Sequence, residues 1–320
     1  LSYWYFLYFV RKYNPNNQKL FWANAIFFLL SIPLLLHFRQ CRYYAPSVLF
    51  TLIALDGYLD LANRKTLFRY FIGSILLFHT SLPGALALQV SFWLHSLFIS
   101  AKNRTFHPLI LFTKSFIFTL PFTILWVLWL KIGGQNINFN FELIKQHILQ
   151  HYQYIHKYIF PFFLFIVFLS PKIRKKFFTN PTLLLFSIII VVNLTLYTFN
   201  HPYFFRYLVP LIPLFIYITS WLLAKGNKFT ALITTLVIIQ IVNKTFPNYV
   251  YEITHKYYGA NNQLTNYLNS LDRSKYQTLA VNYDDFTFRF HTQVKTIGPQ
   301  ELPDLSTCPD IIFIFPEWGN

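Results

Sequence analysis

The stretch TLLLFSIIIVVNLTLY, residues 182–197, contains no charged residue and is apolar along most of its length. An α-helix needs about 20 mainly apolar residues to cross a bilayer, and somewhat fewer when it is tilted or lies beside a polar cavity. The stretch therefore predicts a membrane-spanning helix. Similar runs recur along the chain, so the predicted fold is an all-α polytopic membrane bundle.

The composition favours the same class of protein. Of the 320 residues, 55% are hydrophobic and 21% aromatic, but only 12% are charged, where soluble domains carry about a quarter. The acidic residues are unevenly placed, since only Asp56, Asp60 and Glu142 precede Glu252. This break predicts two parts: a transmembrane helical domain over residues 1–243 and a small extracytoplasmic α/β tail over residues 244–320.

The apolar runs predict about nine full spans and one partial span. They cover residues 1–10 (the partial one), 20–37, 44–61, 67–78, 85–99, 109–130, 158–170, 182–197, 207–223 and 229–242. The chain contains no Met and opens inside an apolar run. We therefore expect it to be a fragment that is truncated at its N-terminus, and truncation at its C-terminus is a further possibility that the sequence raises.

Basic residues lie in short clusters between the runs, and this arrangement predicts the topology. When the runs are alternated across a bilayer, Lys and Arg favour one side by about two to one, as cytoplasmic loops do. The protein is then a multi-pass protein of the plasma or inner membrane, with its tail on the extracytoplasmic side. The same clustering argues against nucleic acid as a partner, although the formal net charge is +16.

The longest predicted extracytoplasmic segment of the membrane domain, residues 132–157, contains an amphipathic pattern. Its apolar residues recur at steps of three and four, which predicts a helix lying on the membrane surface: Phe141, Ile144, Ile148, Tyr152, Ile155 and Ile159. The opposite face carries Lys145, His147 and His151. The two histidines have metal-ligand spacing, but a solvated polar face is the favoured interpretation.

The tail has the pattern of a small α/β unit. Leu264, Tyr267, Leu268 and Leu271 predict one amphipathic helix. Residues 276–281, 294–297 and 310–315 predict strands, and residues 284–292 predict a helical turn or short helix. Helix and strand alternate, which is typical of α/β architecture.

Cations and aromatic rings gather at the predicted extracytoplasmic ends of the spans. A guanidinium fork matches phosphate oxygens, and Tyr favours the membrane interface. These side chains therefore form a candidate binding site for an anionic lipid headgroup: Arg42, Tyr43, His79, His201, Arg206 and Tyr207. The simpler interpretation is that each arginine only anchors its helix.

Two acidic residues lie in or near a predicted span. Asp60 is expected to be solvated at the cytoplasmic boundary, whereas Asp56 could pair with Lys114 inside the membrane. The two cysteines, Cys41 and Cys308, fit no disulfide framework and no metal-site spacing.

Several segments resemble one enzyme family in their order and spacing. They are RQCRYYAPSVLFTLIAL (residues 39–55), FHTSLPGALAL (78–88), FFRYLVPLIPLFIYI (204–218) and the tail from residue 262. Together they resemble the polytopic GT-C glycosyltransferases of the family 39 type. That family includes protein O-mannosyltransferases and lipid A aminoarabinose transferases.

The resemblance implies that a sugar is transferred from a polyprenyl-phosphate donor to a glycan, lipid or protein acceptor on the extracytoplasmic face. It implies that five residues bind the donor phosphate or shape the site: Arg42, Tyr43, His79, Arg206 and Tyr207. His201 is added to them only because of its predicted position. No cofactor is evident, and a need for a divalent metal is open.

The family's catalytic Asp has no counterpart here. Glu142 is the only acidic residue predicted on the extracytoplasmic side of the membrane domain. We therefore expect the catalytic base to precede Leu1, so no catalytic residue is assigned and this fragment alone is expected to be inactive.

Other functions remain open on the sequence. A transporter or flippase for lipid-linked sugars would use the same cationic face to recognise its substrate, and so would a polysaccharide polymerase. A membrane scaffold without activity is a further alternative.

Overall fold

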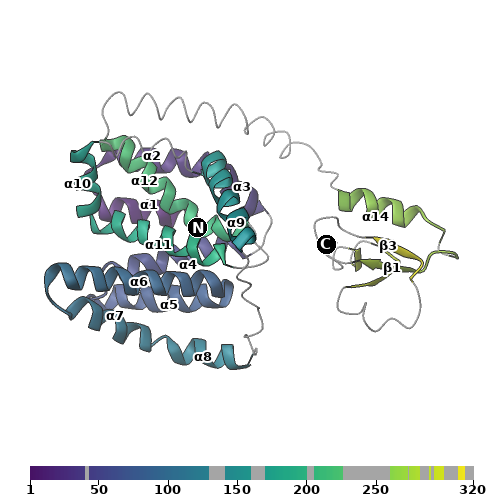
Figure 1. Ribbon diagram of the computed structural model, residues 1–320, viewed down its shortest axis with the longest axis horizontal. Helices are drawn as coiled ribbons and strands as arrows, with labels where there is room; N and C mark the ends of the chain where they lie inside the picture. The colour runs from purple at the N-terminus through teal and green to yellow at the C-terminus, as the bar shows by residue number, and fades with distance from the viewer. Residues whose placement is uncertain are drawn as a thin grey trace. The chain divides into compact units, whose positions relative to one another are not determined.

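The computed structural model describes residues 1–39, 43–129, 141–159, 170–199, 205–225, 260–272, 274–281, 288–289, 292–298 and 309–313. The chain divides into two compact units, Leu1–Pro247 and Asn248–Asn320. Most of the described residues are helical, and the strands lie in the second unit (Figure 1). The prediction of a mostly helical protein with a small sheet near its C-terminus is confirmed.

The first unit is built from helices. They are α1 (Ser2–Tyr13), α2 (Gln18–Leu29), α3 (Ile32–Arg39), α4 (Tyr44–Tyr58), α5 (Arg64–Thr80), α6 (Leu82–Asn103), α7 (His107–Ile117), α8 (Leu120–Trp129), α9 (Phe141–Tyr154), the π-helical η1 (Ile155–Ile159), α10 (Pro171–Thr179), α11 (Pro181–Thr198), the 3-10 helix η3 (Phe205–Leu211) and α12 (Ile212–Lys225).

Two of the predicted spans are broken by proline. Helix α2 ends at Leu29, four residues before Pro33, and α7 ends at Ile117, four residues before Pro121. A proline ring clashes with the carbonyl of the residue four positions earlier and offers no N–H to it. The predicted spans 20–37 and 109–130 are therefore each a pair of shorter helices.

Asparagine and proline begin several helices. The side chain of Asn180 accepts hydrogen bonds from the backbone N–H groups of Thr182 and Leu183, at 3.0 and 3.2 Å. Pro181 follows at the first turn, where its missing N–H costs nothing. Asn17 and Asn63 cap α2 and α5 in the same way.

Helices α4 and α5 approach each other backbone to backbone. A Cβ atom at Gly57 would lie 2.1 Å from the backbone nitrogen of Tyr70, and one at Gly73 would lie 2.5 Å from that of Ala54. Glycine is therefore required at both positions, as at the close helix crossings found in membrane bundles.

Three helices of the described residues are long and apolar enough to cross a membrane: Leu82–Asn103, Pro181–Thr198 and Tyr207–Ala224. The last combines η3 with α12. Other predicted spans correspond to shorter helices. Most of the predicted span 158–170, and all of 229–242, lie outside the described residues.

The three long helices run antiparallel in sequence order, which defines two ends of the first unit. Gly84 of α6 lies near the Tyr197 hydroxyl of α11, while His95 of α6 lies near the backbone of Pro181. The Tyr217 ring of α12 packs on Phe186 of α11, with ring centres 5.0 Å apart. Figure 1 shows α10 at one end of this bundle and α3 and α9 at the other.

We call these the cationic end and the tyrosine end. The cationic end is defined by Lys102 in the last turn of α6, by Arg104 directly after it, and by the basic residues of α10. The tyrosine end is defined by Tyr43, Tyr197 and Tyr207.

The second unit is a small α/β fold. Helix α14 (Ala260–Ser270) accompanies a parallel sheet of β1 (Thr278–Val281), β2 (Lys295–Ile297) and β3 (Ile311–Phe313), in the order β2-β1-β3. The predicted helix and strands are confirmed where they are described. Leu268, Leu279 and Phe288 are buried in its core, but Tyr267 is 60% exposed, so its predicted place on the apolar face is wrong.

Candidate functional site

The tyrosine end brings together residues that lie far apart in the sequence. Tyr43 immediately precedes α4, and Tyr207 belongs to η3, which packs against both α4 and α11. The Tyr207 ring stacks on Tyr197 at the end of α11, with ring centres 5.4 Å apart. Tyr43 is also close enough to Tyr197 to act on it electrostatically.

Tyr197 is the centre of this group. Its side chain is only 2% exposed. Its hydroxyl lies above the first turn of α6, 3.7 Å from where a Cβ of Gly84 would stand, and the Ser81 side chain approaches the same point. Tyr197 is not among the site residues predicted from the sequence. The interfacial preference of tyrosine at a span end, which selected Tyr43 and Tyr207, applies equally to it.

Tyr44 adds a buried hydroxyl beside Tyr43. Its side chain is 1% exposed, and its hydroxyl has no hydrogen-bond partner among the described residues. The His37 ring from α3 packs edge-on against it, at 5.0 Å between ring centres. A buried hydroxyl without a partner costs free energy, so a polar ligand group or a water at this end would be stabilised.

The predicted site residues divide into three groups. Tyr43 and Tyr207 meet around Tyr197, as described above. His79 lies on the last turn of α5 with its side chain exposed, and its ring contacts Phe78. Arg42 and His201 lie outside the described residues, as does the side chain of Arg206, whose backbone belongs to η3.

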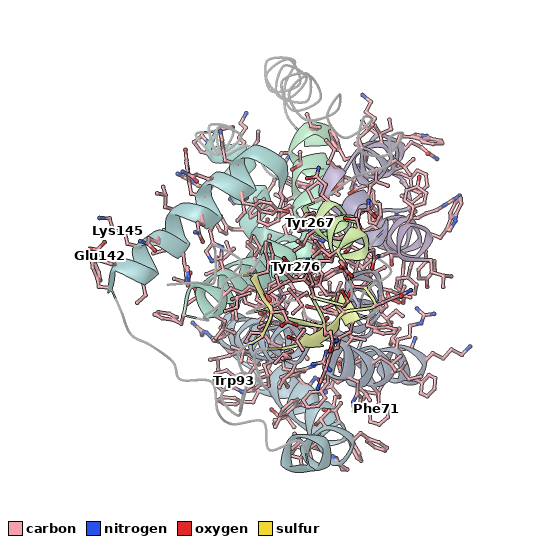
Figure 2. The ribbon with its side chains drawn as sticks, turned by 90° about the vertical axis from the view of Figure 1, so that its right-hand side faces the viewer. Phe71, Trp93, Glu142, Lys145, Tyr267 and Tyr276 are labelled. Atoms are coloured by element: carbon pink, nitrogen blue, oxygen red, sulfur yellow. The ribbon has the colours of Figure 1, made fainter. Side chains whose placement is uncertain are left out.

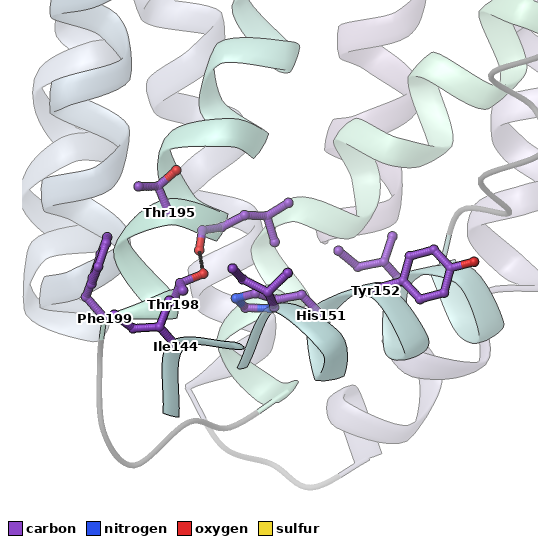
Figure 3. A pocket seen from close by; sticks show the side chains of 9 residues that line it. Ile144, His151, Tyr152, Thr195, Thr198 and Phe199 are labelled. Atoms are coloured by element: carbon purple, nitrogen blue, oxygen red, sulfur yellow. Dashed lines mark hydrogen bonds between the residues drawn. The ribbon is translucent and has the colours of Figure 1, made fainter. Parts of the chain in front are cut away.

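An apolar groove of about 410 Å³ lies beside the tyrosine end, between α9 and α11. Figure 3 shows that both helices contribute to its walls, Ile144 and Tyr152 from α9, and Thr195 from α11. Thr198, which also lines it, directly follows Tyr197. The groove therefore adjoins the tyrosines along α11.

The orientation of α9 differs from the sequence prediction. His147 and His151 are 4% and 6% exposed, so they are not a solvated face. A ring nitrogen of His147, Nδ1, lies 2.8 Å from the backbone oxygen of Thr198 and donates to it. In contrast, Phe141 and Ile148 are 76% and 55% exposed.

The reason for this orientation is that the histidines join α9 to α11. The predicted apolar face is divided by it: Phe141, Ile148 and Tyr152 are exposed, whereas Ile155 is 1% exposed. Burial and the neighbouring His147 lower the pKa of His151 to about 4, so its ring is neutral at pH 7. Glu142 and Lys145 lie together on the exposed side of α9, 3.9 Å apart (Figure 2).

Asp56 does not pair with Lys114, so that prediction is wrong. The carboxylate of Asp56 is fully buried, and each of its oxygens lies 2.6 Å from a cation: Lys12 at Oδ1 and Arg69 at Oδ2. Lys114 is exposed on α7. Alternating the predicted spans puts Lys12 and Arg69 on the same predicted side of the bilayer, but only the packing of α1 and α5 around α4 shows that they meet.

Hydroxyl groups complete the surroundings of Asp56. Tyr5 and Tyr13 each donate to the carboxylate at 3.0 Å, and Arg69 also donates to the Tyr8 hydroxyl at 3.0 Å. With every lone pair engaged, this carboxylate is suited to joining α1, α4 and α5 rather than to removing a proton from a substrate.

Within the part of the chain that the structure describes, no three side chains of His, Cys, Asp and Glu come together in a way that could hold a metal ion. Comparisons of this chain with protein-family models, with curated proteins and with solved structures gave no match.

Proposed function

We propose that this protein is a membrane glycosyltransferase that transfers a sugar from a polyprenyl-phosphate donor to a glycan, lipid or protein acceptor. The observation that carries the proposal is the meeting of Tyr43 and Tyr207 around Tyr197. In the sequence, Tyr43 follows Arg42 and Tyr207 follows Arg206. Two tyrosines separated by more than half of the chain, each preceded in the sequence by an arginine, thus lie at one end of the bundle.

Such an end suits a lipid-linked phosphate. Guanidinium groups bind phosphate oxygens in a bidentate manner and stabilise the charge that develops on a phosphate leaving group. Tyrosine hydroxyls, including the buried one of Tyr44, supply further donors. The adjoining apolar groove between α9 and α11 provides a surface for the isoprenoid chain of the same donor.

The proposal includes the finer topology predicted from the sequence. About nine full spans and one partial span would form a GT-C-like domain in the plasma or inner membrane, with the tail on the extracytoplasmic side. Arg206 is the first choice for holding the departing phosphate and Arg42 the second, while His79 and His201 would shape the rim of the site. The proposal assigns no residue of this chain as the catalytic base.

The first prediction tests Arg206 in the full-length protein. Arg206→Ala should lower kcat/KM for transfer from a polyprenyl-phosphate sugar by about 100-fold, because one donor to a charged leaving group is lost. The measurement is the release of radiolabelled sugar from the donor, with the protein reconstituted in liposomes.

Matched variants make the result specific. Arg206→Lys keeps the charge and should retain part of the activity, and Arg104→Ala, at the cationic end, should behave as the wild type. Unchanged turnover by Arg206→Ala would remove this residue from the site. Movement of the intact donor across the liposome membrane without transfer would instead favour a transporter or flippase, and donor-dependent chain growth would favour a polymerase.

A further inference from the structure

Helix α10 is a short helix with one side packed against the bundle and the other side exposed. Phe177 is 4% exposed, and its ring packs edge-on against Trp221 of α12, at 5.7 Å between ring centres. Ile173, one turn earlier, is partly buried in the same core. These two residues fix the face of α10 that points to the bundle.

The neighbours of α10 place it at a membrane boundary. The spanning helix Pro181–Thr198 begins two residues after α10 ends at Thr179. Trp221, which Phe177 contacts, lies one turn from the end of the spanning helix Tyr207–Ala224. Two membrane-spanning helices therefore end at α10, which puts it at the level of lipid headgroups.

The outer side of α10 is strongly basic. Lys172, Arg174, Lys175 and Lys176 are all exposed. Among the described residues, no carboxylate lies within ion-pair distance of these four cations. The same end of the bundle also carries the exposed Lys102 and Arg104.

An exposed aromatic ring accompanies the charges. Phe178 is 53% exposed, and it lies one turn after Arg174, on a stripe between the buried face and the lysines. Cations next to an exposed ring on a surface helix are the pattern of helices that bind anionic membranes: the ring enters the acyl region and the cations stay among the headgroups.

We propose that α10 is a binding surface for anionic lipid headgroups at the cationic end of the bundle, with Lys172, Arg174, Lys175 and Lys176 as the contacting groups and Phe178 as the inserted side chain. The partner follows from charge complementarity and from the position of α10 at the ends of two spanning helices. This proposal is independent of the sugar-transfer activity, which belongs to the tyrosine end.

The experiment, which is the second prediction, titrates the purified full chain in detergent with phosphatidylglycerol and, separately, with phosphatidylcholine. Bound lipids are counted by native mass spectrometry. The wild type should bind the anionic lipid more tightly, and added salt should weaken the difference. Lys175→Gln should weaken phosphatidylglycerol binding about fivefold, and the combined Lys172→Gln, Arg174→Gln, Lys175→Gln and Lys176→Gln variant should abolish the preference.

The matched controls separate a headgroup surface from general electrostatics. Lys145→Gln removes a similarly exposed lysine from α9, at the other end, and should leave phosphatidylglycerol binding unchanged. Replacing Lys172, Lys175 and Lys176 together by Arg keeps the charge and should keep the binding, which also shows that the region folds. Equal loss for Lys145→Gln and Lys175→Gln, or an unchanged preference in the combined variant, would overturn the proposal.

Discussion

Asp56 shows at the scale of a single residue how this bundle accommodates charge. Its carboxylate is fully buried and lies between Lys12 and Arg69, whose side chains are 25% and 37% exposed. An ionised group removed from water is tolerated only when opposite charges and hydrogen bonds replace its hydration. Gly57, the next residue, allows the close approach of α5 that brings Arg69 within reach.

The third prediction concerns the charge of Asp56. Asp56→Asn should lower the free energy of unfolding by about 2–3 kcal/mol, because Lys12 and Arg69 lose their shared partner while remaining partly screened by solvent. Thermal unfolding in detergent would measure it. Asp60→Asn is the matched control, since Asp60 is partly exposed. A similar loss of unfolding free energy for both variants would show that the ion pairs of Asp56 add no stability beyond that of a partly exposed carboxylate.

Helix α9 shows at the scale of an element that a hydrophobic pattern does not by itself fix an orientation. Its histidine side packs on α11, and three residues of its predicted apolar side, Phe141, Ile148 and Tyr152, stay exposed. For a helix at a membrane surface this arrangement is favourable, because lipid can cover the apolar side. The buried histidines then make the attachment of α9 sensitive to protonation.

The fourth prediction follows from the lowered pKa of His151. Free in water, the ring has a pKa near 6.5, whereas in the docked helix burial and His147 lower this pKa to about 4. The undocked state therefore binds more protons between these values, and docking weakens as the pH falls from 6.5 towards 4. Hydrogen–deuterium exchange of residues 141–154, corrected for intrinsic rates, should be faster at pH 5 than at pH 7.5.

A neutral replacement tests the assignment to this histidine. His151→Gln should remove most of the pH dependence, while His107→Gln, which changes an exposed histidine on α7, should leave it intact. The same acceleration at pH 5 in His151→Gln as in the wild type would mean that another group titrates.

The whole molecule consists of two compact units with separate cores. In the second unit, Asp310 fixes the register of the parallel sheet. One of its carboxylate oxygens accepts hydrogen bonds from the backbone N–H groups of Gln277 and Thr278 and from the Thr278 hydroxyl, each at 2.8 Å. These bonds join the start of β3 to the start of β1, and they lower the pKa of Asp310 below its usual value.

The fifth prediction uses this bond set to test the independence of the two units. A carboxylate with a lowered pKa stabilises the fold above its ordinary pKa, and this contribution is lost as the pH falls below about 3.8. Asp310→Asn should mimic that loss at pH 7. Exchange should accelerate in β1 and β3 and stay unchanged in α4 and α5. Faster exchange in both units would contradict separate cores.

The sequence by itself determined that the chain is mostly helical and that its tail holds a small sheet. Hydropathy, proline positions and residue periodicity are properties of short stretches, so they can be read without the fold. Only the tertiary structure decided that Asp56 meets Lys12 and Arg69, that Tyr207 stacks on Tyr197 with Tyr43 nearby, and that α9 buries its histidines. These features depend on how helices rotate and cross, which is set by packing between residues distant in the sequence and leaves no mark in any local pattern.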